Sequence, residues 1–378
     1  MDRKRVVIAG LGDSGVLTAI RLSRRHDVVG VSLNPGLVSG QELGTRLSRP
    51  DDWARDYWIA FDRFRELDGV RTVHGRLTAA DLSARTVTVR DVDGVDQVHG
   101  YDALIVSTGV TNGFWRPGVL QSVGDVDAGL RVAHDRLGAA GSVAVVGGGA
   151  AAVSSAVNIA LRWPDTRVAL YFPGKHVLQQ HHPRVRRRVE RRLTAAGVAL
   201  RPGHRAVIPE DFDCAAITSD PVRWSTGQPP VRADAVLWTV GRVRPNSSWL
   251  PSDVLDEDGF VRVTPDLRVP GTDGVFAVGD IAATDPLRSS ARNRADGLLA
   301  HNVTAYFTGG RVRRYRPPAS RWGSVLGVQP DGLEVFAPNG FAFRFPAWTI
   351  DRVLQPWIVR RGIYRGVRSR DQYIVTSG

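Results

Sequence analysis

The chain has 378 residues, more than one domain usually contains, and this length predicts two or three domains with separate hydrophobic cores. Its net charge of +12 comes almost wholly from arginine. A basic surface can attract nucleic acid, anionic lipid or the phosphates of nucleotide cofactors, so the charge alone leaves the partner open, and a nucleic-acid partner is not expected. A single cysteine, Cys214, excludes an internal disulfide or a redox-active thiol pair. No run of apolar residues reaches the ~18 that a transmembrane helix needs.

The first motif opens the chain. Val6–Ala9 is typical of a buried parallel strand, and the turn G-L-G-D-S-G and an amphipathic helix follow it. In a turn of this spacing Gly10 permits the sharp bend, Gly12 lets the backbone approach a pyrophosphate, and Gly15 lets the helix pack on the strand. We therefore predict a dinucleotide site that also includes Ser14. Because this motif fills the opening stretch, we interpret that stretch as structure, not as a secretion signal, and expect a cytoplasmic protein.

The next strand, predicted over 28–33, lacks the acidic residue that commonly binds the adenosine ribose at this point. Ser32 or Asn34 can take its place, because an uncharged side chain also forms hydrogen bonds with a hydroxyl group.

A second copy of the motif begins about 135 residues later. Val143–Val146 predicts a strand, the turn contains Gly147 and Gly149, and Ala152 stands where a third glycine is usual. A strand over 167–172 should follow the helix, and Lys175 comes soon after it. A cation there can bind the 2′-phosphate of NADPH, whereas an acidic residue would favour NADH. An ordinary surface lysine is the alternative, so both nucleotides remain open.

Three further segments, over 101–109, 235–242 and 272–282, complete a recognisable order of motifs. Together with the two glycine turns they resemble the pyridine-nucleotide–disulfide oxidoreductase superfamily of flavoproteins. Within it, the order is most similar to the apoptosis-inducing-factor-like, ferroptosis-suppressor-like and type II NADH:quinone oxidoreductase proteins.

This resemblance implies an α/β protein with two nested Rossmann-type domains and a small C-terminal α+β region. Residues 1–115 and 245–310 would form a split FAD-binding domain, 116–244 an inserted NAD(P)-binding domain, and 311–378 a β unit with a basic amphipathic helix. FAD, with NADH or NADPH as co-substrate, is the implied cofactor.

The resemblance also implies roles for single residues. Thr108, Gly109, Gly279 and Asp280 would contact FAD, and Gly241 would contact the nicotinamide nucleotide. The Asp280 carboxylate can accept hydrogen bonds from ribityl hydroxyl groups, and a helix N-cap is the alternative role.

Several positions depart from the family pattern. Ser154 stands where quinone-reductase relatives often carry a glutamate, and residues 291–295 lack the glutamines of the type II quinone-site motif. These departures leave the electron acceptor open, and also whether the nicotinamide site works. His181 and His182 are interpreted as the polar start of an arginine-rich helix, and no metal site is expected.

The C-terminal region predicts strands over 323–328, 333–337 and 341–345, joined by P-D-G and P-N-G turns. A helix should follow over 348–368, with six arginines against one acid in 351–370. Its apolar residues are predicted to share one face: Ile350, Val353, Leu354, Trp357 and Ile358. That face suits an anionic membrane surface, but it can equally pack on the protein itself or on a second subunit.

These observations favour an NAD(P)H:acceptor oxidoreductase at the inner face of the cell membrane, with a quinone as acceptor. The alternatives are a reductase of a soluble carrier such as ferredoxin, and a flavin-bearing binding protein whose nicotinamide site has decayed. The sequence leaves open whether the chain forms a homodimer.

Overall fold

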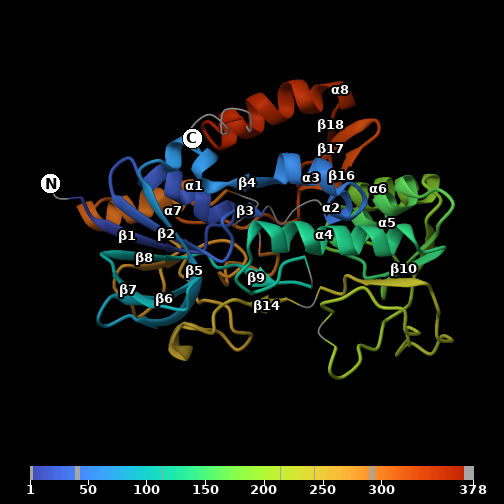
Figure 1. Ribbon diagram of the computed structural model, residues 1–378, viewed down its shortest axis with the longest axis horizontal. Coiled ribbons are helices and arrows are strands. Elements are labelled where there is room, and N and C mark those ends of the chain that lie inside the picture. Colours follow the sequence, from blue (N-terminus) through green and yellow to red (C-terminus); the bar gives the residue numbers. More distant parts are fainter. Residues whose placement is uncertain are drawn as a thin grey trace.

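The computed structural model describes residues 3–38, 43–113, 115–212, 214–241, 243–288, 290 and 294–369. Two β-sheets organise it, and a C-terminal arm lies across them (Figure 1). The predicted α/β class is confirmed.

The larger sheet has the strand order β15-β8-β1-β2-β5-β6-β7. Its first five strands are parallel, and β6 and β7 return antiparallel. In sheet order the strands span Val275–Ala277, Ala103–Val106, Arg5–Ala9, Asp27–Ser32, Val70–Asp81, Thr86–Asp91 and Asp96–Gly100. The helices α1 (Asp13–Leu22) and α7 (Asp296–Thr308) pack together against this sheet. The central strands are continuously apolar because both faces of the sheet are covered.

The smaller sheet is wholly parallel, in the order β12-β11-β10-β13. Its strands span Ala199–Arg201, Arg167–Tyr171, Ser142–Val146 and Ala235–Trp238. The helices near it are α4 (Val123–Gly138), α5 (Ala150–Arg162) and α6 (Pro183–Ala195). The strands predicted around both glycine turns agree with the structure to within one residue.

The chain passes between the two sheets twice, at β9 (Val110–Thr111) and β14 (Arg244–Pro245), which pair antiparallel. It leaves the larger sheet after β8 and rejoins it at β15, the neighbour of β8. The smaller sheet is therefore an insertion in the larger unit.

Several short elements lie outside the two main sheets. They are β3 (Gly36–Val38), β4 (Trp58–Ala60), α2 (Leu43–Ser48), α3 (Pro50–Tyr57) and the 3-10 turns Phe61–Arg63, Arg65–Leu67 and Ser252–Val254. All six residues of α2 are buried, and this helix packs closely against α5.

The C-terminal arm begins as an antiparallel meander of β16 (Gly323–Gln329), β17 (Gly332–Phe336) and β18 (Ala342–Phe345), as predicted. The short helix α8 (Ala347–Thr349) and the π-helix η4 (Ile350–Ile363) follow. Figure 1 shows this helix crossing the top of the molecule, from the meander to the region above α1.

The prediction that five apolar residues share one helical face is wrong. Ile350 and Leu354 are buried, whereas Val353, Trp357 and Ile358 are exposed. In a π-helix each N–H bonds to the residue five positions earlier, so a turn contains more residues than the 3.6 of an α-helix. Side chains on the protein-facing side therefore recur at Ile350, Leu354, Val359 and Ile363.

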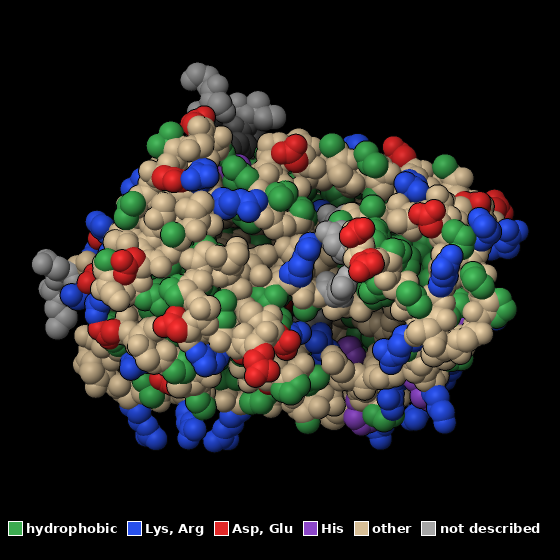
Figure 2. Space-filling view, turned by 90° about the horizontal axis from the view of Figure 1, so that it is seen from below, with side chains coloured by type: hydrophobic (Ala, Val, Ile, Leu, Met, Phe, Trp, Pro, Cys, Tyr) green, Lys and Arg blue, Asp and Glu red, His purple; other side chains and the backbone are tan. Residues whose placement is uncertain are grey.

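The face of the molecule opposite the C-terminal arm carries charged, polar and apolar side chains (Figure 2). Figure 2 shows Lys and Arg side chains scattered over this face and projecting from its lower edge. Among the described residues, no helix is both long and apolar enough to cross a bilayer.

Candidate functional site

The first glycine turn joins β1 to α1 and leaves open space beside Gly12 at the helix N-terminus. Gly10 has φ +102°, and a Cβ atom on it would collide with the carbonyl of Ser107. A Cβ atom on Gly15 would collide with the Gly10 carbonyl, whereas one on Gly12 would meet no atom within 4 Å. Gly12 is the helix N-cap and supplies no side-chain cap, so the first N–H groups of α1 can bind a phosphate.

The second turn, between β10 and α5, repeats this geometry. Gly147 has φ +143° and lies against the carbonyl of Thr239. Gly149 caps α5 without a side chain, and a Cβ atom on it would also meet nothing within 4 Å. Ala152 is fully buried, where its methyl group contributes to the core between helix and sheet. Open space therefore lies at the carboxyl ends of the parallel strands β1 and β10, and at both places a dinucleotide pyrophosphate fits.

The end of β2 distinguishes between the two residues considered for the ribose. The Ser32 hydroxyl accepts a hydrogen bond of 3.1 Å from the Asn34 backbone N–H and so stabilises the turn. The Asn34 Oδ1 atom is buried and has no hydrogen-bond partner among the described residues. A buried amide oxygen without a partner is costly, so Asn34 suits a ligand hydroxyl group better than Ser32 does.

The ends of β8 and β15 meet the first turn. Gly279 has φ +88°, and a Cβ atom on it would lie 3.3 Å from the Ser14 Oγ atom. Gly109 has φ +65° and faces open space. The Thr108 hydroxyl instead donates a hydrogen bond of 2.8 Å to the Asn246 carbonyl. This side chain therefore links the two segments, near β9 and β14, in which the chain passes between the sheets. Gly279 thus lies beside Ser14 of the first turn, and Gly109, like Gly12, borders open space.

Asp280 follows β15 and pairs with Arg116, whose Nη1 atom lies 3.0 Å from its Oδ2 atom. Both side chains are about one-third exposed, so the carboxylate remains accessible. The N-cap alternative for Asp280 does not apply to α7, because that helix begins at Asp296 with Ala295 as its cap.

The sequence did not indicate Arg116 or its neighbour Arg46. Arg46 lies on α2, where its guanidinium donates to the Trp115 carbonyl at 2.5 Å and stacks 4.6 Å from the Trp53 ring centre. Burial, reinforced by the nearby positive charge of Arg116, lowers the Arg46 pKa to about 10. No local pattern marks these residues, because the hydrogen-bond partners Trp115 and Asp280 are distant from them in sequence.

Ser154 lies inside the protein on α5, with 4% of its surface exposed. Its hydroxyl accepts a hydrogen bond from the Gly44 N–H at 3.3 Å and donates to the Leu326 carbonyl at 3.2 Å. A Cβ atom on Gly44 would collide with Ser154, so α2 needs a glycine at this contact. The serine therefore links α5 to α2 and to the C-terminal meander. A glutamate, which is larger, would not fit here unless α2 or the meander moved.

The ends of β11 and β13 border the second turn, because Cβ atoms on Gly148 and Gly147 would contact Phe172 and Thr239. Buried Phe172 follows β11, and Lys175 is exposed. Gly241 has φ +74° and faces open space after β13. His182 caps α6 by accepting a hydrogen bond from the Arg184 N–H, which agrees with its interpretation as a helix start. Arg242 and residues 291–293 of the altered quinone-site segment lie outside the described residues.

Known proteins resemble this chain over most of its length. It is 27% identical over 350 residues to oxidoreductase ptaL from Pestalotiopsis fici, covering 86% of this chain and 89% of that protein. It is also 27% identical to ferroptosis suppressor protein 1 from Xenopus tropicalis, covering 83% and 84% of the two chains.

Solved structures share the fold. The sulfide:quinone oxidoreductase from Aquifex aeolicus has a TM-score of 0.71 at 15% identity, over 98% of this chain and 94% of that one. The water-forming NADH oxidase from Lactobacillus brevis, bound to NADH, has a TM-score of 0.63 at 15% identity, over 93% and 77% of the two chains.

Residues 4–307 match the family described as pyridine nucleotide-disulphide oxidoreductase, which confirms the resemblance predicted from the motifs. The match includes both glycine turns and the return of the chain to the larger sheet. The chain therefore belongs to the pyridine nucleotide-disulphide oxidoreductase family and is an FAD-dependent NAD(P)H oxidoreductase.

Proposed function

We propose that this enzyme transfers electrons from NAD(P)H, by way of FAD, to a quinone at the inner surface of the cell membrane. In this proposal the larger unit, residues 1–115 and 245–310, holds FAD. The inserted unit, residues 116–244, holds the nicotinamide nucleotide, and residues 311–378 face the membrane. When bound, the two cofactors supply hydride transfer and onward electron transfer.

The protein's own part is to bind and orient. The N–H groups at the starts of α1 and α5 offer hydrogen bonds to the two pyrophosphates, beside Gly12 and Gly149. Asn34 offers an acceptor to the adenosine ribose, and Asp280 offers one to the ribityl chain. Gly109, Gly279 and Gly241 keep the backbone close to the cofactors without side chains in the way.

The observation that carries the choice of a lipid-dissolved acceptor is an exposed aromatic face on the C-terminal arm. Trp348 and Trp357 expose 65% and 57% of their surfaces, although large apolar side chains are usually covered. We use the name aromatic face for the exposed apolar residues of the arm, which are Phe341, Phe343, Trp348, Val353, Trp357 and Ile358. Tryptophan is favoured at membrane interfaces, where its ring can lie in the apolar layer and its N–H in the polar layer.

Positive charge borders this face, which suits anionic lipid. Arg352 and Arg361 are exposed, and the Arg361 guanidinium lies 5.0 Å from the Trp357 ring centre. The charge is smaller than the sequence predicts, because Arg360 pairs with Asp56 and Arg368 pairs with Asp68. The sulfide:quinone oxidoreductase named above adds support, since its name includes the proposed acceptor.

Two measurements test this function. Anaerobic stopped-flow mixing of the yellow protein with NADH or NADPH should bleach the flavin absorbance rapidly with at least one nucleotide. The reduced enzyme should then be reoxidised by a short-chain quinone faster than by ferredoxin. Bleaching by neither nucleotide would support the binding protein with a decayed nicotinamide site instead.

A soluble carrier is the second candidate acceptor, and α6 favours it. Its arginines Arg184, Arg187 and Arg191 are exposed, while Arg188 and Arg192 pair with Glu334 and Asp331 of the meander. A basic helix of this kind can dock an acidic protein. Fast reoxidation by ferredoxin that weakens with added salt, together with slow reoxidation by quinone, would establish this alternative.

A further inference from the structure

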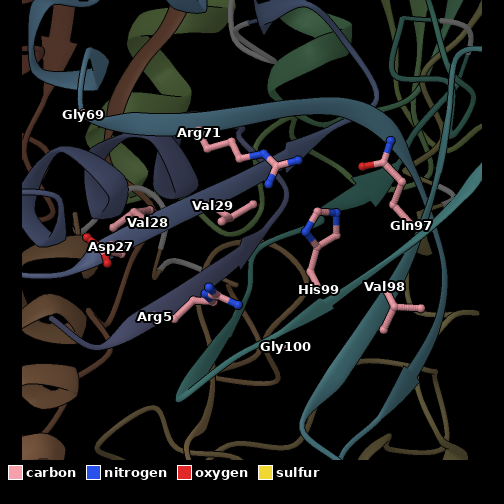
Figure 3. Close-up of a pocket in the computed structure, with 10 residues that line it drawn as sticks. All are labelled: Arg5, Asp27, Val28, Val29, Gly69, Arg71, Gln97, Val98, His99 and Gly100. Carbon is pink, nitrogen blue, oxygen red and sulfur yellow. The ribbon is translucent and has the colours of Figure 1, made fainter. Parts of the chain in front are cut away.

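A pocket of about 430 Å³ opens on the larger sheet, away from both glycine turns. It lies at the amino ends of β1, β2 and β5, whereas the glycine turns follow the carboxyl ends of β1 and β10. Arg5 pairs in register with Asp27 and Val29 with Arg71, so these side chains share one face of the sheet. The end of β7, with His99, also lines the pocket (Figure 3).

Two arginines give the pocket its charge. Figure 3 shows Arg5 and Arg71 reaching into it from β1 and β5, the strands on either side of β2, toward the ring of His99. Neither guanidinium has a side-chain partner among the described residues. Asp27 also lines the pocket, but its carboxylate lies 2.9 Å from the Arg3 guanidinium, which offsets its charge.

His99 supplies a neutral group beside these charges. Only 8% of its surface is exposed, and its Nε2 atom is buried without a hydrogen-bond partner in the described part of the chain. Burial, together with the positive charges of Arg71 and Arg5, lowers the pKa of the imidazole below its usual value. A negatively charged ligand would provide the missing partner and offset the repulsion between the positive groups.

We propose that this pocket binds the phosphate group of a small molecule, at a third site separate from the two cofactor sites. Arginine guanidinium groups match phosphate oxygens in pairs, and His99 Nε2 adds a third contact. The volume falls in the range of about 300–1,000 Å³ that is common for small-molecule sites, and Val29, on the same face as the two arginines, provides an apolar contact for the rest of the ligand.

The test is isothermal titration calorimetry of the FAD-loaded protein with glycerol 3-phosphate, inorganic phosphate and glycerol. We expect saturable binding of glycerol 3-phosphate and none of glycerol. Arg5→Gln and Arg71→Gln should each weaken the binding by about tenfold or more, because each removes a charge-assisted contact. The retained flavin absorbance shows that each variant is folded.

Two control variants show at which site the phosphate binds. Lys175→Gln removes a cation near the second glycine turn, and Arg191→Gln removes one from α6; both should bind as the unchanged protein does. Equal affinity for inorganic phosphate would identify the free ion as ligand, and weaker affinity would identify an ester. No binding at millimolar concentration, or binding lost in Lys175→Gln but kept in Arg71→Gln, would overturn the proposal.

Discussion

Gly12 and Gly149 occupy equivalent positions, and each can be tested without disturbing the fold. Their φ angles, −73° and −90°, suit any residue, and an added Cβ atom meets no neighbour. We predict that Gly12→Val folds normally but loses FAD, because the side chain fills the space for the pyrophosphate. Flavin absorbance relative to protein after purification measures this loss.

Gly149→Val provides the matched control for this substitution. It should keep its flavin, while the rate of bleaching by NAD(P)H at low nucleotide concentration falls about tenfold or more. If both variants retained FAD and were bleached normally, neither turn would bind a pyrophosphate.

Asp280 is the charged residue whose role is most open to test. If the carboxylate binds the cofactor, Asp280→Ala should lose flavin more readily than Arg116→Ala, although each substitution breaks the same ion pair. A partly exposed ion pair of this kind contributes only about 0–1 kcal/mol to stability, so both variants should fold. Dialysis followed by flavin absorbance compares them, and equal retention would reduce Asp280 to a partner of Arg116.

Lys175 is exposed near the end of β11, where the adenosine end of the nucleotide is proposed to lie. We predict that Lys175→Glu shifts the preference from NADPH toward NADH, because a carboxylate repels the 2′-phosphate and can accept hydrogen bonds from ribose hydroxyl groups. The ratio of kcat/KM values for the two nucleotides measures this shift. An unchanged ratio would leave Lys175 as a surface charge.

At the scale of elements, the C-terminal arm is anchored to the first glycine turn. Buried Tyr364, just after η4, donates a hydrogen bond of 3.0 Å to Asp13, the first residue of α1. Tyr364→Phe should lower the free energy of unfolding by about 1.5–3 kcal/mol, as expected for a hydrogen bond to a charged group. Urea unfolding measures this change.

Tyr101→Phe is the control, because its buried hydroxyl has no partner among the described residues. Its removal should be neutral or stabilising. Burial and the Asp13 carboxylate raise the Tyr364 pKa, so the folded protein keeps a proton that the unfolded chain loses above about pH 10. The stability from Tyr364 should therefore shrink as pH rises beyond that value, and a difference that grew would contradict the assignment.

Elements whose signals are local could be predicted from the sequence. Each glycine turn is specified by about ten consecutive residues, and the three meander strands are separated by proline and glycine turns. The π-helix was not predicted, because the apolar residues were assigned to one face with the period of an α-helix, 3.6 residues per turn. The sequence therefore placed on one face residues that the structure divides between the core and the surface.

At the scale of the whole molecule, the unpredicted features depend on contacts between distant segments. The paired residues Arg116 and Asp280 are 164 residues apart in the sequence, and the hydrogen-bonded residues Gly44 and Ser154 are 110 residues apart. The sequence identified Ser154 as a departure from the family pattern, but only the packing of α2 and the meander explains it. From the sequence alone, the loss of a functional residue cannot be distinguished from the gain of a structural contact at the same position.

In the proposed function, the aromatic face orients the molecule by contacting the membrane. Each Trp ring can bury roughly 150–250 Å² in the lipid interface, at about 25 cal/mol per Å². The double variant Trp348→Ser, Trp357→Ser should therefore bind vesicles of phosphatidylglycerol and phosphatidylcholine more than tenfold less tightly than the unchanged enzyme. Flotation of the FAD-loaded protein measures the binding, which should also weaken with added salt because Arg352 and Arg361 contribute.

Val132→Ser is the matched control, because this valine on α4 is 69% exposed but lies outside the aromatic face. It should float as the unchanged protein does. Reduction of a soluble quinone analogue should survive in the double variant, because the proposed cofactor contacts lie outside this face. If the unchanged protein did not bind vesicles but its mass in solution fell by half in the double variant, the aromatic face would join two copies of the chain instead.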